Sequence, residues 1–325
     1  MNTKEKLLSL FENSRGTYIS GEEIAERLGC SRAAVWKAVN ALRGEGHSIS
    51  AVTNKGYCLD PASDVLSQAG VEKYLGSLAG KITLDVRKSV DSTNNVLREL
   101  AAKNAPEGTV SIAGMQTGGK GRLGRSFFSP QDSGLYMSIL LRPEMSALDA
   151  VRITTAAAVA VAETVEDISG KKAAIKWVND VRIGGKKICG ILTEASFSLE
   201  NGGLEYAVVG IGVNAYEPEG GFPEEIRDIA GAVFTEHRED LRCRLAGGII
   251  TRFMELYRDL SSEDMLKAYR SRLEWKDEQI RVIRGTEEFE CTLIDVDDAY
   301  ALKVRLNDGS EQLVSSGEIT IRRKK

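Results

Sequence analysis

The sequence predicts an α+β protein made of three successive parts. Two short helical patterns and a hairpin pattern occupy residues 1–62, and helices mixed with apolar strands fill residues 66–274. Short alternating strands follow over residues 275–325. At 325 residues, the chain is long enough for two or three domains that each bury a core.

The first part is predicted to be a winged helix-turn-helix. Ser20 is a typical N-cap for its first helix, with Glu23 as the capping-box partner, and Gly29 ends that helix. A second Ser-capped helix is expected over residues 31–43, and two short helices joined by a tight glycine turn are typical of a helix-turn-helix. The hairpin pattern of residues 46–59 would then form the wing.

One face of the second helix is a candidate DNA-binding surface. Helical spacing directs Val35, Val39 and Leu42 to a core, and the other face could enter a major groove. The candidates on that face are Ser31, Arg32, Trp36, Lys37 and Asn40. Trp36 fits a core position equally well. Residues 1–60 hold eight Lys/Arg and seven Asp/Glu, so a helical protein-interaction module is the alternative.

The most informative stretch is Gly118-Gly119-Lys120-Gly121-Arg122-Leu123-Gly124-Arg125. Its four glycines allow positive φ and expose amide groups, and its three cations can surround an anion. The sequence therefore predicts a phosphate- or carboxylate-binding loop between two strands. A Walker loop is excluded because Gly121, and not Ser or Thr, follows Lys120. We expect a ligand to order this loop, because ordering so many glycines costs entropy.

Further polar groups stand where predicted elements begin or end. The stretch Asp91-Ser92-Thr93-Asn94-Asn95 begins a helix, where capping groups can also bind a polar ligand. Lys176 lies in an otherwise apolar strand, which is costly unless the lysine is paired or directed to a site. That strand ends in Asn179 and Asp180, and Lys187 opens the second arm of the hairpin that follows.

The strand over residues 208–213 ends at Asn214 and resembles a dinucleotide-binding fingerprint. No helix pattern follows it, so we reject a Rossmann fold. Alternating short strands over 279–283, 288–295, 301–306, 311–314 and 318–321 predict a small SH3-like β-barrel.

The composition argues against several classes of protein and site. No apolar run approaches the roughly 20 residues of a membrane span, and no signal-type core follows Met1, so we predict a cytoplasmic protein without a membrane partner. The five cysteines stand far apart, which argues against disulfides and zinc sites, and no protein-held metal is predicted. With two histidines only, catalysis is expected to work by positioning and charge.

Taken together, these motifs resemble those of the biotin protein ligases. They are Asp91-Ser92-Thr93-Asn94, Gln116 to Arg125, Lys176-Trp177-Val178-Asn179-Asp180, Lys187 to Glu194 and Gly210-Ile211-Gly212-Val213-Asn214. With the winged helix, the whole chain resembles the bifunctional class, the biotin operon repressors of the BirA family. The resemblance implies a central domain related to class II aminoacyl-tRNA synthetases and lipoate ligases, followed by an SH3-like domain.

Two positions depart from the pattern of that family. Lys120 stands where the family loop usually has arginine, which keeps the charge but loses the bidentate fork. Val178 replaces the proline of the usual Lys-Trp-Pro-Asn-Asp motif and gives up its fixed φ.

The resemblance also implies a two-step reaction. Biotin and ATP give biotinyl-5′-AMP and pyrophosphate, and a lysine of a biotin carboxyl carrier protein then accepts the biotinyl group. Because two anions must meet, cations matter more than a base. The implied ligands are biotin, ATP and Mg²⁺, and the implied partners are the carrier protein, operator DNA and a second copy of the chain once adenylate is bound.

The resemblance assigns site residues as follows. The biotin-binding set is Ser92, Thr93, Asn94, Gln116, Lys120, Gly121, Arg122 and Lys187. The nucleotide-binding set is Arg122, Arg125, Lys176, Asn179 and Asn214. The catalytic set is Lys187, Arg122, Arg125, Lys176 and Asp180, where Asp180 would deprotonate or orient the acceptor lysine.

Three alternatives remain at this point. The scaffold could serve a lipoate-type cofactor ligase, the winged helix could have lost DNA binding, or the ligase part could be degenerate in a pure transcription factor.

Overall fold

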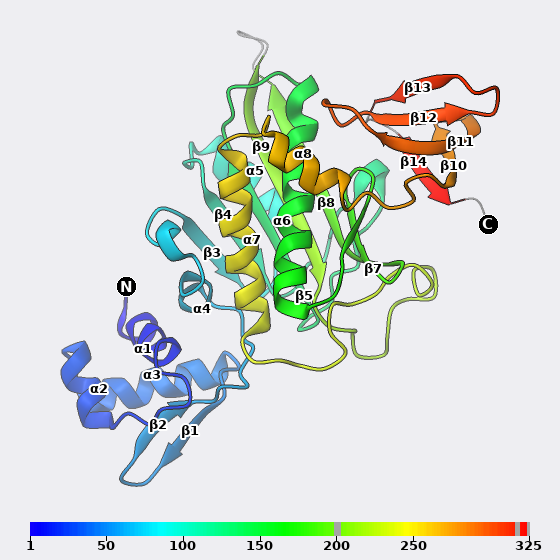
Figure 1. Ribbon diagram of the computed structural model, residues 1–325. Helices are drawn as coiled ribbons and strands as arrows, with labels where there is room; N and C mark the ends of the chain where they lie inside the picture. The colour runs from blue at the N-terminus through cyan, green and yellow to red at the C-terminus, as the bar shows by residue number, and fades with distance from the viewer. Residues whose placement is uncertain (198–202, 316–318, 324–325) are drawn as a thin grey trace. The chain divides into compact units, whose positions relative to one another are not determined.

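The computed structural model describes residues 1–197, 203–315 and 319–323, and the chain forms two units (Figure 1). The first unit contains residues 1–80 and 236–248, and the second contains residues 81–235 and 249–325. Each unit is therefore discontinuous in sequence. Helix α7 (Leu241–Tyr257) begins in the first unit and continues into the second.

The first unit contains the predicted winged helix-turn-helix. Its elements are α1 (Thr3–Glu12), α2 (Gly21–Leu28), α3 (Arg32–Gly44) and the antiparallel hairpin β1 (Ile49–Val52) and β2 (Gly56–Leu59). The Ser20 and Ser31 hydroxyls cap α2 and α3, and Gly29 ends α2 at φ 61°. Of the expected capping box, the bond from the Glu23 amide to the Ser20 hydroxyl is present. The Glu23 side chain forms an ion pair with Arg27.

Buried ions tie α1 to the rest of the first unit. Arg15 lies 2.7 Å from Glu12 and 2.8 Å from Asp240, and Lys73 pairs with both carboxylates. The Tyr74 hydroxyl donates to Asp240, just after the short helix α4 (Gln68–Glu72). Burial acts to lower the pKa of the Arg15 guanidinium, but its hydrogen bond to Glu12 and the charges of Glu12 and Asp240 outweigh burial, so the pKa is raised.

The second unit is built on a mixed seven-stranded sheet. Its order is β3-β4-β5-β9-β8-β7-β6, where β3 and β4 are parallel and the other neighbours are antiparallel. The strands are β3 (Thr83–Arg87), β4 (Thr109–Ala113), β5 (Gly134–Leu141), β6 (Ala174–Lys176), β7 (Asp180–Ile183), β8 (Lys186–Phe197) and β9 (Leu204–Asn214).

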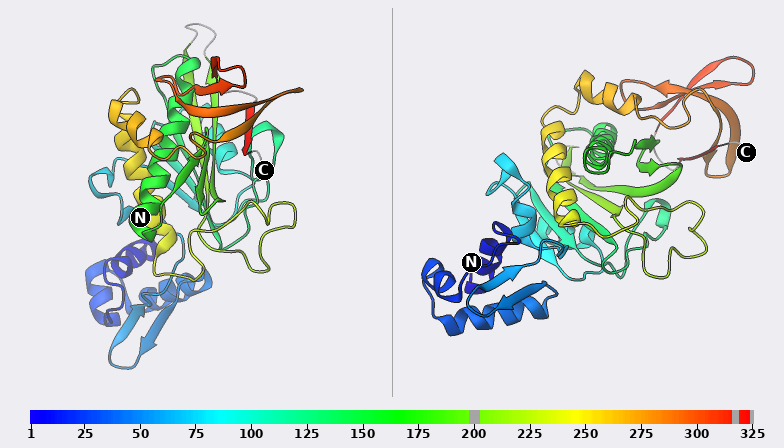
Figure 2. Two further views of the ribbon diagram at one scale, coloured as in Figure 1. Left: turned by 45° about the vertical axis from the view of Figure 1, so that its right-hand side comes forward. Right: turned by 60° about the horizontal axis from the view of Figure 1, so that its bottom comes forward.

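Helices cover this sheet and place the loops at its ends. They are α5 (Thr93–Ala102), α6 (Val151–Ser169) and α8 (Glu263–Arg270). Short 3-10 turns lie at Arg122–Gly124 and Leu148–Ala150, and a third lies in the first unit at Gly76–Leu78. Figures 1 and 2 show α6 and α8 on the same side of the sheet. The long alanine-rich helix α6 is almost entirely buried over its middle, and Gly170 follows it as the C-cap at φ 69°.

The C-terminal strands form a five-stranded antiparallel sheet in the order β13-β12-β11-β10-β14. They are β10 (Gln279–Arg284), β11 (Glu287–Val296), β12 (Leu302–Leu306), β13 (Glu311–Val314) and β14 (Ile319–Arg323). The expected start of the last strand at Glu318 lies outside the described residues. The sheet is consistent with the predicted SH3-like barrel, although β13 and β14 do not pair within the described residues. No helix in the described ranges has the length and hydropathy to cross a membrane.

The ion cluster predicts a large loss of stability in Asp240→Ala. This variant leaves the buried Arg15 without one of its carboxylates, and breaking a buried pair costs about 3–5 kcal/mol. Hydrogen exchange of the α1 amides should accelerate accordingly. Glu263→Ala is the control, since Glu263 forms only an exposed ion pair with Lys267. Equal exchange in the two variants would show that the cluster does not hold α1.

Candidate active site and DNA-binding surface

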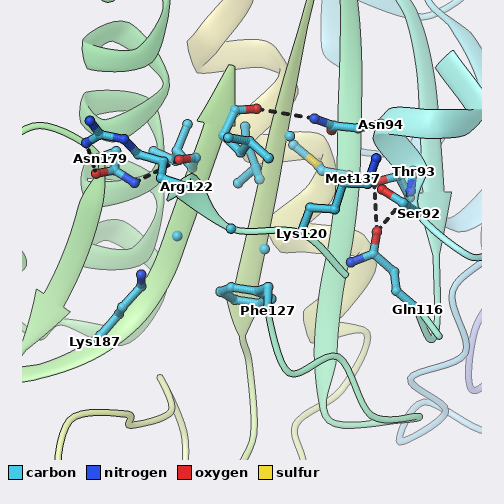
Figure 3. Close-up of a pocket in the computed structure, with 17 residues that line it drawn as sticks. Ser92, Thr93, Asn94, Gln116, Lys120, Arg122, Phe127, Met137, Asn179 and Lys187 are labelled. Carbon is cyan, nitrogen blue, oxygen red and sulfur yellow. Dashed lines mark hydrogen bonds between the residues drawn. The ribbon is translucent and has the colours of Figure 1, made fainter. Parts of the chain in front are cut away.

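The predicted loop and the polar strand ends meet around one pocket of the second unit (Figure 3). Its walls are the start of α5, the glycine-rich loop, and the central strands β5, β8 and β9. All eight residues of the predicted biotin-binding set line it: Ser92, Thr93, Asn94, Gln116, Lys120, Gly121, Arg122 and Lys187. Asn179, from the nucleotide-binding set, lies there as well.

The start of α5 is capped from outside the helix. Ser92 is the N-cap residue, but its hydroxyl makes no capping bond. Instead, Gln116 accepts hydrogen bonds from the Thr93 amide at 2.9 Å and the Thr93 hydroxyl at 3.2 Å, and it donates to Ser129. Gln116 is thus fixed at the helix N-terminus, whose partial positive charge favours anions.

Asn94 is the most constrained side chain of the pocket. It is only 4% exposed, donates to Glu194 at 2.7 Å, and accepts from the Ser138 hydroxyl at 2.6 Å. The Ser138 hydroxyl also lies 2.7 Å from the Thr93 hydroxyl. A buried amide with all of these partners has one orientation, so this wall is rigid before any ligand is considered.

The glycine-rich loop reaches both sides of the pocket through its cations. Lys120 donates to Asn95 on α5 at 2.7 Å, and Arg122 donates to Asn179 at 3.0 Å. The Asn179 amide in turn donates to the Ile191 carbonyl on β8. Burial lowers the pKa of Arg122, although Asp180 opposes that shift.

Lys187 faces this loop from the start of β8. Its ammonium lies 2.6 Å from the Asp180 carboxylate, and its backbone pairs with residues 229–231. Asn214 donates to the Gly231 carbonyl at 2.9 Å, so its amide is directed to that segment and away from the pocket lining. Both residues therefore fix the segment that follows β9.

Other predicted residues lie outside the lining. Arg125 is exposed, and Lys176 points its ammonium over the ring of Trp275 at 5.5 Å. Asp180 is not part of the lining, but it forms an ion pair with the lining residue Lys187. The sequence motifs could not give the side-chain directions of these groups.

Sequence reasoning also missed part of the lining. The missed residues are Phe127, Met137, Gly190, Ile191, Leu192, Gly210, Ile211 and Gly212. A Cβ on Gly210 would lie 2.2 Å from Asn94 Oδ1, and one on Gly212 would lie 2.5 Å from the Phe127 ring. Two glycines spaced by two in a strand share one face, and this alternation was the available signal.

The candidate DNA-binding residues occupy the outer face of α3 in the first unit. Ser31, Arg32, Trp36 and Lys37 are exposed, whereas Asn40 is half-buried. Trp36 is 58% exposed, so the alternative that placed it in the core is wrong. Val35, Val39 and Leu42 are buried as predicted.

Comparison with known proteins decides the family. Residues 3–58 match the HTH domain profile, and residues 86–214 match the Biotin/lipoate A/B protein ligase family. Over 322 residues, the chain is 33% identical to the bifunctional ligase/repressor BirA of Bacillus subtilis, covering 96% of this chain and 97% of that protein. The chain belongs to the BirA family. The predicted combination of a biotin ligase and a repressor in one chain is thereby confirmed.

Further BirA-family relatives agree. The bifunctional ligase/repressor BirA of Escherichia coli is 29% identical and matches 98% of this chain and 96% of its own. The Aquifex aeolicus biotin protein ligase in complex with biotin and ATP superposes with a TM-score of 0.62 at 26% identity. That structure covers 74% of this chain and 99% of its own length.

Gly210 on β9 leaves no space for a side chain, so we predict that Gly210→Ala destabilises the protein. The added methyl group collides with the fixed Asn94 amide, and overpacking of this kind costs about 1–3 kcal/mol. Urea unfolding measures the loss. Gly44→Ala is the control, because a Cβ there meets open space. An unchanged midpoint for Gly210→Ala would mean that Asn94 can move, contrary to its bonding.

Proposed function

We propose that this pocket joins biotin to ATP, and that the enzyme then transfers the biotinyl group to a lysine of a biotin carboxyl carrier protein. The observation that carries the proposal is the convergence of Arg122, Lys120 and Lys187 on a pocket that also holds the start of α5. Relatives described as biotin–[acetyl-CoA-carboxylase] ligases, such as that of Paracoccus denitrificans, support biotin over lipoate as the substrate.

Charge is the main demand of the first step. The biotin carboxylate attacks the α-phosphorus of ATP, so two anions that repel each other must approach closely. Arg122 and Lys187 stand on the pocket wall where they stabilise both anions and the charge that develops between them. The pocket also holds the substrates in position, which supplies much of the remaining acceleration.

The biotin end is assigned to the rigid wall. Ser92, Thr93 and Asn94 form the start of α5, all three are buried, and Gln116 binds the Thr93 amide. These polar groups suit the ureido ring of biotin, whereas Phe127 and Leu192, on the face of the two glycines, offer apolar contacts to its chain. Lys120, Gly121, Arg122 and Lys187 would then meet the carboxylate end.

The nucleotide end is assigned to Arg122, Arg125, Lys176, Asn179 and Asn214. Mg²⁺ is proposed to arrive on the ATP phosphates, where it neutralises charge and activates the α-phosphorus. The described residues include no cluster of three carboxylate, histidine or cysteine ligands. We propose that the metal keeps phosphate and water oxygens in its octahedral shell.

In the second step, an acceptor lysine must lose a proton before it attacks. Asp180 is the proposed group that receives or orients this amine, since it lies at the pocket edge with Lys187 at 2.6 Å. The transfer forms an amide bond with biotin and releases AMP, and the lysine proton leaves through Asp180 or water.

The first experiment is mass spectrometry of an apo biotin carrier domain incubated with the protein, biotin and Mg-ATP. The carrier should gain one biotinyl group. Lys187→Met should slow adenylate formation about 100-fold, because it removes a cation aimed at developing charge. Lys81→Met, at an exposed lysine, should behave as wild type. A carrier without added mass, in a reaction that forms no adenylate, would refute the proposal.

For the repressor activity, we propose that α3 enters the major groove of an operator. Ser31, Arg32, Trp36, Lys37 and Asn40 would make the contacts. We further propose that adenylate orders the glycine-rich loop and promotes a homodimer, which presents two winged helices to a two-fold operator.

The five free cysteines support a reducing, cytoplasmic setting.

We also propose three domains with boundaries at 1–62, 66–274 and 275–325. The profile matches at 3–58 and 86–214 support the first two, and the five-stranded sheet that begins at Gln279 supports the third.

DNA binding is tested with the double variant Arg32→Ala/Lys37→Ala. Its affinity for a duplex that carries the biotin-gene promoter of the same organism should fall. If each side chain contacts a phosphate, the slope of log affinity against log salt concentration should decrease in magnitude by about 2. Fluorescence anisotropy with biotin and Mg-ATP present measures both quantities. The ligase activity should not change. Undiminished affinity would remove α3 from the interface.

A further inference from the structure

Trp275 lies over a charged face of the β6–β7 hairpin. Lys176 pairs with Asp180 in register, and Ala174 pairs with Arg182, so Lys176, Asp180 and Arg182 share one face. The Lys176 ammonium lies 5.5 Å from the centre of the Trp275 ring, and the Arg182 guanidinium lies 5.3 Å from it. One aromatic ring therefore contacts two cations next to the Asp180–Lys187 pair.

The backbone of Trp275 is held in an uncommon conformation. Its φ is 66°, in the left-handed region that bulky side chains rarely adopt. The segment before it pairs with the sheet edge, where the Ile175 amide donates to the Arg272 carbonyl and the Glu274 amide donates back to Ile175. Such strain persists where surrounding contacts impose it, and it is typical of functional sites. Here the strained residue directs its ring to two cations.

The two cations differ in their partners. Arg182 forms an ion pair with Glu274 at 2.8 Å. For Lys176, no carboxylate of the described residues lies within 4.0 Å, and the Trp275 ring is its contact. Burial lowers the pKa of Lys176, and Asp180 opposes that shift. A carboxylate partner would cancel the charge of Lys176, whereas an aromatic face holds the ammonium and leaves its charge in place.

We propose that Trp275 is a positioning residue for the ligase reaction, which fixes the Lys176 ammonium beside Asp180 so that its charge acts on the ATP phosphates. This inference rests on the proposed function, since it needs a polyphosphate near the Asp180–Lys187 pair. A fixed cation in a half-buried site acts more strongly than one that moves in water. Trp275 lies in the segment between α8 and the C-terminal sheet. Through Trp275, this segment would determine the position of the Lys176 charge.

The test compares kinetic constants for adenylate formation, measured by pyrophosphate release with biotin and Mg-ATP. Trp275→Leu should raise KM for ATP about tenfold, which lies between the worth of an exposed and of a desolvated cation–π contact, with KM for biotin nearly unchanged. Trp275→Phe keeps an aromatic face and should raise it only about threefold. In a Lys176→Met background, both substitutions should change KM for ATP less than about twofold, because coupled residues are not additive.

A merely structural Trp275 gives a different pattern. Equal effects of Trp275→Leu with and without Lys176, or equal effects of the Leu and Phe variants, would overturn the proposal. If Trp275→Leu does not fold, the Phe variant in both backgrounds decides. Tyr18→Leu is the matched control, since it removes a ring under Lys55 in the winged helix. Wild-type protein that releases no pyrophosphate would refute the ligase assignment instead.

Discussion

The candidate site depends on the charge balance around one carboxylate. Asp180 forms an ion pair with Lys187 and faces Lys176 across the β6–β7 hairpin. Its charge also opposes the lowering of the Arg122 pKa by burial. Without Asp180, three cations would converge on a half-buried space and repel one another. With it, the site keeps an excess of positive charge that suits two anionic substrates. The arrangement of β6, β7 and β8 at the sheet edge can therefore be understood as a scaffold for that balance.

Local signals in the sequence predicted much of this molecule. Ser20, Ser31 and Gly29 marked helix ends correctly, and the glycine-rich loop marked the pocket. The eight biotin candidates reached the lining because their motifs end strands or begin a helix on a shared sheet. Their roles as ligands remain predictions.

What the sequence could not supply were directions and partners distant along the chain. Trp275 stands about a hundred residues after Lys176, and no periodicity links the two. Likewise, the capping of Thr93 by Gln116 depends on how the turn after β4 packs on α5. Asn214 shows the same limit, because a residue type at the end of a strand does not determine where its side chain points.

The discontinuity of the first unit bears on how the two activities can be separated in the laboratory. Residues 236–248 complete this unit, and Asp240 and Arg242 form buried ion pairs with Arg15 and Asp64. A truncated ligase that starts after residue 62 or 80 would keep Asp240 and lose Arg15. Genetic dissection by deletion would thus confound the loss of DNA binding with a misfolded segment. Point substitutions on the outer face of α3 avoid this artefact.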